Sequence, residues 1–169
     1  MPPPIGLGCH QPVLCLYTPH RPPLPRYQRQ RSYRVARPGE TARIIAETGN
    51  HWRKILSIFA KIYCQLFSPP EPWQKVRDQH LLTGGSRTAL LWQTQLLPAE
   101  GAIHIIGGRD FAAGFELPPS TARAVDGMSG KITAYGHCYL TPYLDYRQFP
   151  NALIDAFCNH LLSNHELRL

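Results

Sequence analysis

The stretch that most constrains the fold runs from Ile103 to Leu117 and reads IHIIGGRDFAAGFEL. A β-branched apolar run precedes the pair Gly107-Gly108, and a short segment with apolar residues at helical spacing follows the pair. This pattern predicts a buried strand, a tight turn and the beginning of a helix. Ligands of open α/β sheets bind past the carboxyl ends of the strands, so we expect a ligand-facing crevice just after Ile106.

Strand patterns and helix patterns alternate along the rest of the chain. Strand compositions occur at 12–18, 88–93 and 132–141, and helices are predicted at 40–48, 50–67, 73–82 and 151–162. The alternation predicts an α/β fold with three α/β/α layers and a mostly parallel central sheet of about four strands. We expect a loose N-terminal arm at 1–11, a single domain at 12–165 and a loop at 118–131.

Positive charge is concentrated in one part of the chain. The formal net charge is +7, and nine basic residues against two acidic residues between positions 21 and 54 account for all of it. Such a concentration favours phosphate groups, acidic partners or an anionic surface. The long connection at 21–39 also contains Tyr27 and Tyr33 among its arginines. These rings are able to stack on bases, and the plainer alternative is that they anchor a solvated basic loop.

Several classes of site and location find no support. The five cysteines are odd in number and form no CxxC pair, and the eight histidines show no HxxxH or HExxH pattern. We therefore expect no disulfide framework, no metal site and no cofactor. No apolar run approaches the roughly 20 residues that span a bilayer. The beginning of the chain does not resemble a signal peptide, so we expect a cytoplasmic protein that does not enter membranes.

Three blocks, taken in order, carry a resemblance to a known family. They are Gly49–Leu56 (GNHWRKIL), Ile103–Phe115 and Tyr139–Asn151 (YLTPYLDYRQFPN). They resemble, respectively, a GNxFWxxL block, a strand-Gly-helix block and the final strand with its minor-groove loop in the uracil-DNA glycosylase superfamily. The similarity is greatest to the branches that act on mismatched uracil, thymine or hypoxanthine. It spans most of 12–162 and implies a glycosylase-like fold with a nucleic-acid or nucleobase ligand.

The chain departs from that family in both catalytic loops. The first loop of the family has a Gly-x-x-Pro type motif with an Asp, Asn or Glu, whereas this chain has YTPHR at 17–21. The second commonly has His-Pro-Ser, whereas this chain has PYLDYR at 142–147. We therefore expect the fold to carry over without the standard catalytic motifs.

N-glycosidic cleavage defines what a catalytic site here would need. A carboxylate would position water or stabilise the cationic sugar, and Asp145 is the candidate. A donor would stabilise the departing base, and His20 or Arg109 is the candidate. The residues expected to bind a ligand are Tyr17, Asn50, Gly107, Gly108, Arg109, Tyr143 and Arg147. The plainer alternatives are that Asp145 caps a turn or pairs with Arg147, and that His104 is a hydrogen-bonded histidine of the core.

Three functional hypotheses follow from the sequence. The leading one is a glycosylase-like domain that binds nucleic acid or a nucleobase-containing ligand and lacks the standard catalytic motifs. The second is an active glycosylase in which Asp145 and His20 take rearranged roles. The third is a protein-interaction module, in which the proline-rich arm and the basic loop dock another subunit, for example a second copy of the chain in a homodimer.

Overall fold

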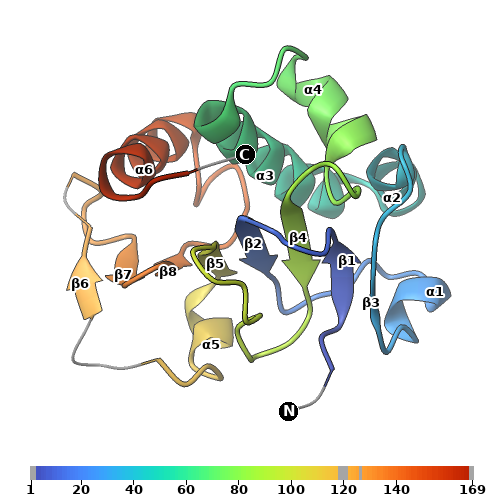
Figure 1. Ribbon diagram of the computed structural model, residues 1–169, viewed down its shortest axis with the longest axis horizontal. Coiled ribbons are helices and arrows are strands. Elements are labelled where there is room, and N and C mark those ends of the chain that lie inside the picture. Colours follow the sequence, from blue (N-terminus) through green and yellow to red (C-terminus); the bar gives the residue numbers. More distant parts are fainter. Residues whose placement is uncertain (1–2, 118–121, 126, 168–169) are drawn as a thin grey trace.

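A mixed sheet of eight described strands runs through the middle of the protein (Figure 1). The computed structural model describes residues 3–117, 122–125 and 127–167. In chain order the strands are β1 (Gly6–Gly8), β2 (Leu14–Tyr17), β3 (Tyr33–Arg34), β4 (Thr88–Leu91), β5 (Ile103–Gly107), β6 (Ala122–Ala124), β7 (Thr133–Tyr135) and β8 (Cys138–Thr141). Within the sheet they lie in the order β3-β1-β4-β2-β5-β8-β7-β6. The α/β class predicted from the sequence is therefore confirmed.

The four central strands β4, β2, β5 and β8 are parallel to one another. Tyr17 lies opposite Leu91 on one side and Ile106 on the other, and Gly107 lies opposite Thr141. The carboxyl ends of these strands are thus level at one edge of the sheet. Every residue of β2, β4 and β5 is buried, as expected for parallel strands covered on both faces.

The sheet is larger than the predicted set of about four strands, because short strands extend both sides. Residues 1–11, expected as a loose arm, contribute β1, which pairs with β3 and β4. A Cβ atom at Gly8 would lie 2.6 Å from the Cα atom of Ala89, so glycine is what permits this close approach. On the other side, the expected loop at 118–131 contains β6, while 118–121 and 126 lie outside the described residues.

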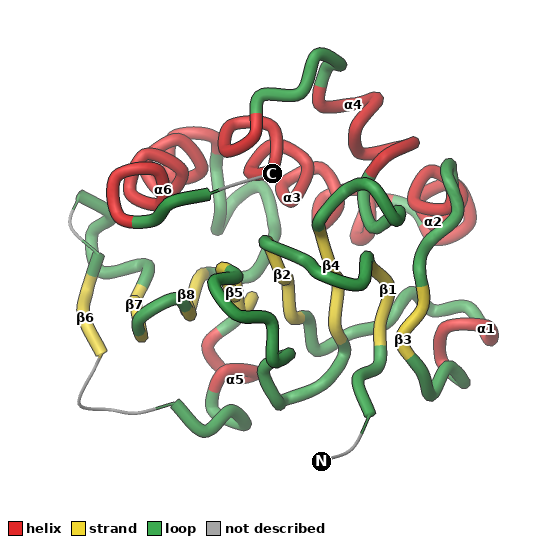
Figure 2. The backbone as a smooth tube through the Cα atoms, in the orientation of Figure 1, coloured by secondary structure: helices red, strands yellow, loops and turns green. Residues whose placement is uncertain are grey.

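The helices cover the two faces of the sheet unequally. They are α1 (Pro25–Gln28), α2 (Glu40–Thr48), α3 (Asn50–Phe67), α4 (Trp73–Lys75) with the π-helical turn η1 (Val76–His80), α5 (Arg109–Ala112) and α6 (Asn151–Asn164). In Figure 1, α2, α3, α4 and α6 lie on one face, whereas α5 lies on the other. Figure 2 shows that the chain around α5 is mostly loop. None of the described helices is long and apolar enough to cross a membrane.

Each face of the sheet has its own apolar core. The face toward α3 receives Leu14 and Leu16 of β2, packed with the buried stripe of α3 that includes Ile55 and Phe59. The opposite face receives Cys15 and Tyr17 of the same strand, packed with Phe115 and the loops near α5. The alternation of side chains along β2 divides its residues between these two cores.

The basic connection at 21–39 is folded against the body of the protein and contains α1 and β3. Arg21 donates hydrogen bonds to three backbone carbonyls, those of Tyr27 at 2.8 Å, Gln28 at 3.1 Å and Gln30 at 2.7 Å. The Tyr27 ring is fully buried and its hydroxyl donates to Glu40 at 2.7 Å. Tyr33 donates its hydroxyl proton to the carbonyl of Cys9. The two tyrosines therefore anchor this segment.

Candidate functional site

A crevice lies at the edge of the sheet where β2, β5 and β8 end. Its volume is about 500 Å³, and the end of β5, the helix α5 and the loops after β2 and β8 supply its lining. The lining residues are Pro19, His20, Gly107, Gly108, Arg109, Asp110, Phe111, Tyr143 and Gln148. The structure thus has a crevice just after Ile106, at the carboxyl ends of the parallel strands, where the sequence predicted one.

Two glycines line the crevice, Gly107 at the end of β5 and Gly108 directly after it. A Cβ atom at Gly107 would lie 3.0 Å from the Leu144 side chain, so a larger residue would displace that leucine. Gly108 has φ +108°, a conformation that favours glycine, and its N–H donates to the carbonyl of Thr141 at 3.0 Å. This bond fixes the turn from β5 to α5 against the end of β8.

Three rings from distant parts of the chain meet beside the crevice. The His51 Nε2 atom and the Tyr143 hydroxyl are hydrogen-bonded at 2.7 Å, with ring centroids 5.7 Å apart. His20 approaches both rings edge-on, with its centroid 5.8 Å from His51 and 6.1 Å from Tyr143. His20 follows β2, His51 lies in the first turn of α3 and Tyr143 follows β8, so the fold alone brings them together.

The surroundings set the protonation states of this pair. Partial burial, together with the electrostatic effects of His20 and Lys54, lowers the pKa of His51, although Asp145 acts in the opposite direction. Burial and the Asp145 carboxylate raise the pKa of Tyr143 to about 12. At neutral pH both side chains are therefore uncharged. Whichever tautomer His51 adopts, the pair retains a donor and an acceptor that can bond a ligand.

Asp145 acts on the crevice by its charge and does not line it. Its Oδ1 atom accepts the backbone N–H of Arg147 at 2.8 Å, and its Oδ2 atom lies 3.8 Å from Nζ of Lys54. The N–H of Arg147 and the charge of Lys54 lower the pKa of the Asp145 carboxyl. Asp145 therefore caps the turn after Tyr143, and the Arg147 side chain is exposed outside the lining.

Two other predicted ligand-binding residues, Tyr17 and Asn50, do not line the crevice. Tyr17 is fully buried; its hydroxyl is hydrogen-bonded to Nδ1 of His104 at 2.8 Å and accepts the N–H of Leu97 at 2.8 Å. Burial raises the pKa of Tyr17 and lowers that of His104 to about 4. His104 is thus the hydrogen-bonded core histidine that the plainer interpretation described. Asn50 is exposed at the beginning of α3, next to His51 but outside the lining.

The structure adds residues that the sequence did not single out. His51 is the most important of them, and the lining residues Asp110, Phe111 and Gln148 complete the wall. His51 belongs to the GNHWRKIL block at the beginning of a predicted helix, and this position is the sequence feature that could have identified it as a site residue. Within the described residues, no three His, Cys, Asp or Glu side chains are grouped so that they could hold a metal ion.

The comparisons with known proteins give one match. The model of a family described as a family of unknown function, DUF6942, matches residues 5–162. No curated protein and no solved structure matches the chain significantly. The matched range extends from β1 into α6 and therefore includes every residue that lines the crevice.

Proposed function

Because the chain belongs to DUF6942, a family of unknown function, its activity has to be inferred from its own residues, and we propose that it binds nucleic acid or another ligand that carries a nucleobase. The observation that carries this proposal is the meeting of His20, His51 and Tyr143 at the crevice. A base taken out of its stack needs flat rings to lie against and hydrogen-bonding groups to pair with its edge. The three rings offer both.

Cationic side chains near the crevice suit the phosphates of such a ligand. Arg109 lies in the lining, Arg147 is exposed directly before the lining residue Gln148, and Arg53 is exposed two residues after His51 in α3. None of these three guanidinium groups has a hydrogen bond or ion pair within the described chain. They are therefore available to phosphate oxygens, which would make binding dependent on salt.

The resemblance to the uracil-DNA glycosylase superfamily supports the same class of ligand. His51 lies in the GNHWRKIL block and Tyr143 in the block that resembles the family's minor-groove loop. We infer a distant variant of that superfamily's three-layer arrangement, with α2, α3 and α6 as one layer and α5 with its loops as the other. Because both catalytic loops depart from the family pattern, binding is the conclusion, and catalysis is the second candidate.

Fluorescence anisotropy with labelled oligonucleotides tests binding. Single-stranded DNA, duplex DNA containing uracil or hypoxanthine, and single-stranded RNA are titrated at increasing salt. We expect affinity for at least one of them to fall steeply with salt, because phosphate contacts release counterions. His51→Ala and Tyr143→Ala should each weaken binding about tenfold, since stacking on one ring contributes about 1–3 kcal/mol per base.

The matched control is His10→Ala, which removes an exposed histidine outside the crevice lining. It should bind as the unaltered protein does. The proposal fails if none of the three nucleic acids is retained, or if His10→Ala weakens binding as much as His51→Ala.

The second candidate is base excision, and the charge of Asp145 on His51 and Tyr143 is the observation that favours it. Asp145 would stabilise the cationic sugar and His20 would donate to the departing base. Duplexes containing uracil or hypoxanthine are incubated with the protein and treated with alkali, which cleaves abasic sites. Strand cleavage that Asp145→Asn abolishes would support this activity. If the strands stayed intact, binding would remain as the only proposed function.

A further inference from the structure

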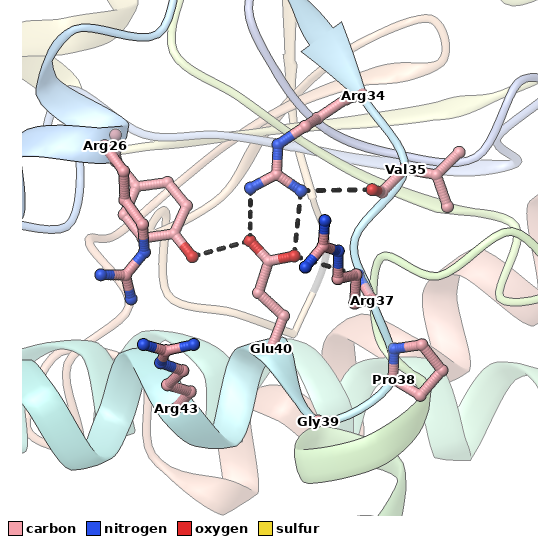
Figure 3. A pocket seen from close by; sticks show the side chains of 9 residues that line it. Arg26, Arg34, Val35, Arg37, Pro38, Gly39, Glu40 and Arg43 are labelled. Atoms are coloured by element: carbon pink, nitrogen blue, oxygen red, sulfur yellow. Dashed lines mark hydrogen bonds and ion pairs between the residues drawn. The ribbon is translucent and has the colours of Figure 1, made fainter.

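A second pocket, separate from the crevice, lies at the edge of the sheet formed by β3. Its volume is about 570 Å³, and α1, β3 with the loop after it, and α2 supply its walls. The lining residues are Arg26, Tyr27, Arg34, Val35, Arg37, Pro38, Gly39, Glu40 and Arg43. The four arginines surround the carboxylate of Glu40 (Figure 3). We refer to it as the arginine pocket.

Glu40 holds one side of the arginine pocket in place. Arg34 donates to its two oxygens at 3.0 and 2.6 Å, and the backbone N–H of Arg37 donates to Oε1 at 3.0 Å. Tyr27 donates its hydroxyl proton to Oε2 at 2.7 Å. Burial alone would raise the pKa of the Glu40 carboxyl, but the hydrogen bonds from Arg34, Arg37 and Tyr27 outweigh it and lower the pKa to about 2. Glu40 is therefore ionised at neutral pH and fixes the Arg34 guanidinium.

Glu47 holds the other side in the same way. Its carboxylate lies 2.5 Å from Nη2 of Arg26 and 3.0 Å from Nε of Arg43. The Arg43 side chain is 70% exposed and uses only Nε, so its two Nη groups remain available. The guanidinium of Arg37 has no hydrogen bond or ion pair within the described chain.

The arginine pocket thus carries more positive charge than its carboxylates neutralise. Four guanidinium groups face two carboxylates, those of Glu40 and Glu47. Guanidinium groups match the oxygens of phosphate in paired hydrogen bonds, and holding them in position before binding lowers the cost of ordering them. A ligand with several phosphate oxygens would use the free donors of Arg37 and Arg43.

We propose that the arginine pocket binds linked phosphate groups, as in pyrophosphate, inorganic triphosphate or the triphosphate of a nucleotide. The volume lies in the range of small-molecule pockets and leaves room for more than one phosphate. The only aromatic residue of the lining, Tyr27, is fully buried, and the Arg26 guanidinium lies over its ring at 4.8 Å. No ring of the lining is therefore free to stack a base, and recognition falls on the phosphates.

Isothermal titration calorimetry with inorganic triphosphate tests the proposal, with sulfate at the same ionic strength as the reference anion. The unaltered protein should bind triphosphate at least tenfold more tightly than sulfate. Arg37→Gln and Arg43→Gln should each weaken triphosphate binding at least fivefold, because each removes a guanidinium with free donors. Arg31→Gln removes an exposed arginine of the same segment outside the lining and should leave binding unchanged.

Two further arms identify the source of the phosphates and separate this site from the crevice. A nucleoside triphosphate should bind within about threefold of inorganic triphosphate if the phosphates alone are recognised. His51→Ala should leave triphosphate binding intact, so the two sites can fail independently. The proposal is overturned if triphosphate does not bind, or if Arg31→Gln weakens triphosphate binding as much as Arg37→Gln does. It is also overturned if an oligonucleotide that has only phosphodiester groups, and no di- or triphosphate, binds the arginine pocket more tightly than triphosphate.

Discussion

Among the hydrogen-bonded tyrosine–histidine pairs of the described chain, two have nearly the same geometry but lie in different environments. Tyr17 and His104 are bonded at 2.8 Å in the core, and Tyr143 and His51 are bonded at 2.7 Å beside the crevice. The ring centroids are 5.7 Å apart in both pairs, with interplanar angles of 39° and 34°. The chemical groups and their spacing therefore do not distinguish a structural pair from a candidate functional one.

Burial and the use of the remaining hydrogen-bonding groups do distinguish them. The Tyr17 hydroxyl also accepts the N–H of Leu97, so the buried pair holds the loop after β4 against the sheet. The pair at the crevice has no such internal partner within the described chain, and His20 and Lys54 influence His51 electrostatically instead. A closed pair stabilises the fold, whereas an open pair retains groups for a ligand.

Lowering the pH should reduce the free energy of unfolding, because the buried pair contains an uncharged histidine. The pKa of His104 is about 4 in the folded protein and 6.5 for a free histidine, so the unfolded chain binds a proton first as the pH falls. The contribution of the uncharged His104 to the free energy of unfolding is fully present above pH 6.5 and is lost as the pH falls toward 4. At about 1.4 kcal/mol for each pKa unit, the loss amounts to about 3 kcal/mol. Urea unfolding at pH 7, 5.5 and 4 measures it.

The control for this loss is His104→Gln, which keeps a hydrogen-bonding side chain that does not titrate. Its free energy of unfolding should change less between pH 7 and pH 4 than that of the unaltered protein. Parallel losses in the two proteins would show that His104 is not the source.

Removing one hydroxyl from each pair is the next test of the comparison. Tyr17→Phe leaves Nδ1 of the buried His104 without a partner and should lower the free energy of unfolding by about 2 kcal/mol. Tyr143→Phe breaks a bond at the surface, where water replaces it, and should cost less than about 1 kcal/mol. Urea unfolding at pH 7 compares the two variants. Equal losses would contradict the division into a closed and an open pair.

The same comparison shows what the sequence could and could not predict. Helical spacing of apolar residues placed α2 and α3 correctly, and short apolar runs placed the central strands. The carboxyl ends of those strands then located His20, Gly107, Gly108, Arg109 and Tyr143 in one crevice. These inferences succeeded because they rest on local periodicity and on one rule about parallel sheets.

Two placements depended on tertiary structure and were not available from the sequence. Tyr17 was expected to face the ligand, but the alternation along β2 places it in the core with Phe115. The periodicity of a strand does not show which of its two faces packs against which part of the protein. His51 was not singled out, because its distance to Tyr143 depends on how α3 crosses the sheet. The strands β1, β3 and β6 are only two or three residues long, too short for a periodic pattern.

Ligand binding should respond to the two hydroxyls in the opposite order from stability. Tyr143→Phe should weaken binding of the best oligonucleotide several-fold, because it removes a polar group that the ligand can reach. Tyr17→Phe should leave the affinity of the folded fraction unchanged, since its hydroxyl is saturated inside the protein. Anisotropy measured below the unfolding transition tests this, with Tyr135→Phe in β7 as the matched control. A larger effect from Tyr17→Phe would place the ligand elsewhere.

The smallest expected effect concerns the charges that distinguish the open pair. Asp145 raises the pKa of His51 and His20 lowers it, so Asp145→Asn should lower the His51 pKa and His20→Gln should raise it. Asparagine can still accept the N–H of Arg147, which preserves the turn while the charge is removed. Titration of the histidine resonances by NMR follows both residues at once, and the His104 pKa, which burial lowers, should not move in either variant. If the His51 pKa shifted in neither variant, burial alone would set it, and the charges beside the crevice would not distinguish the open pair from the closed one.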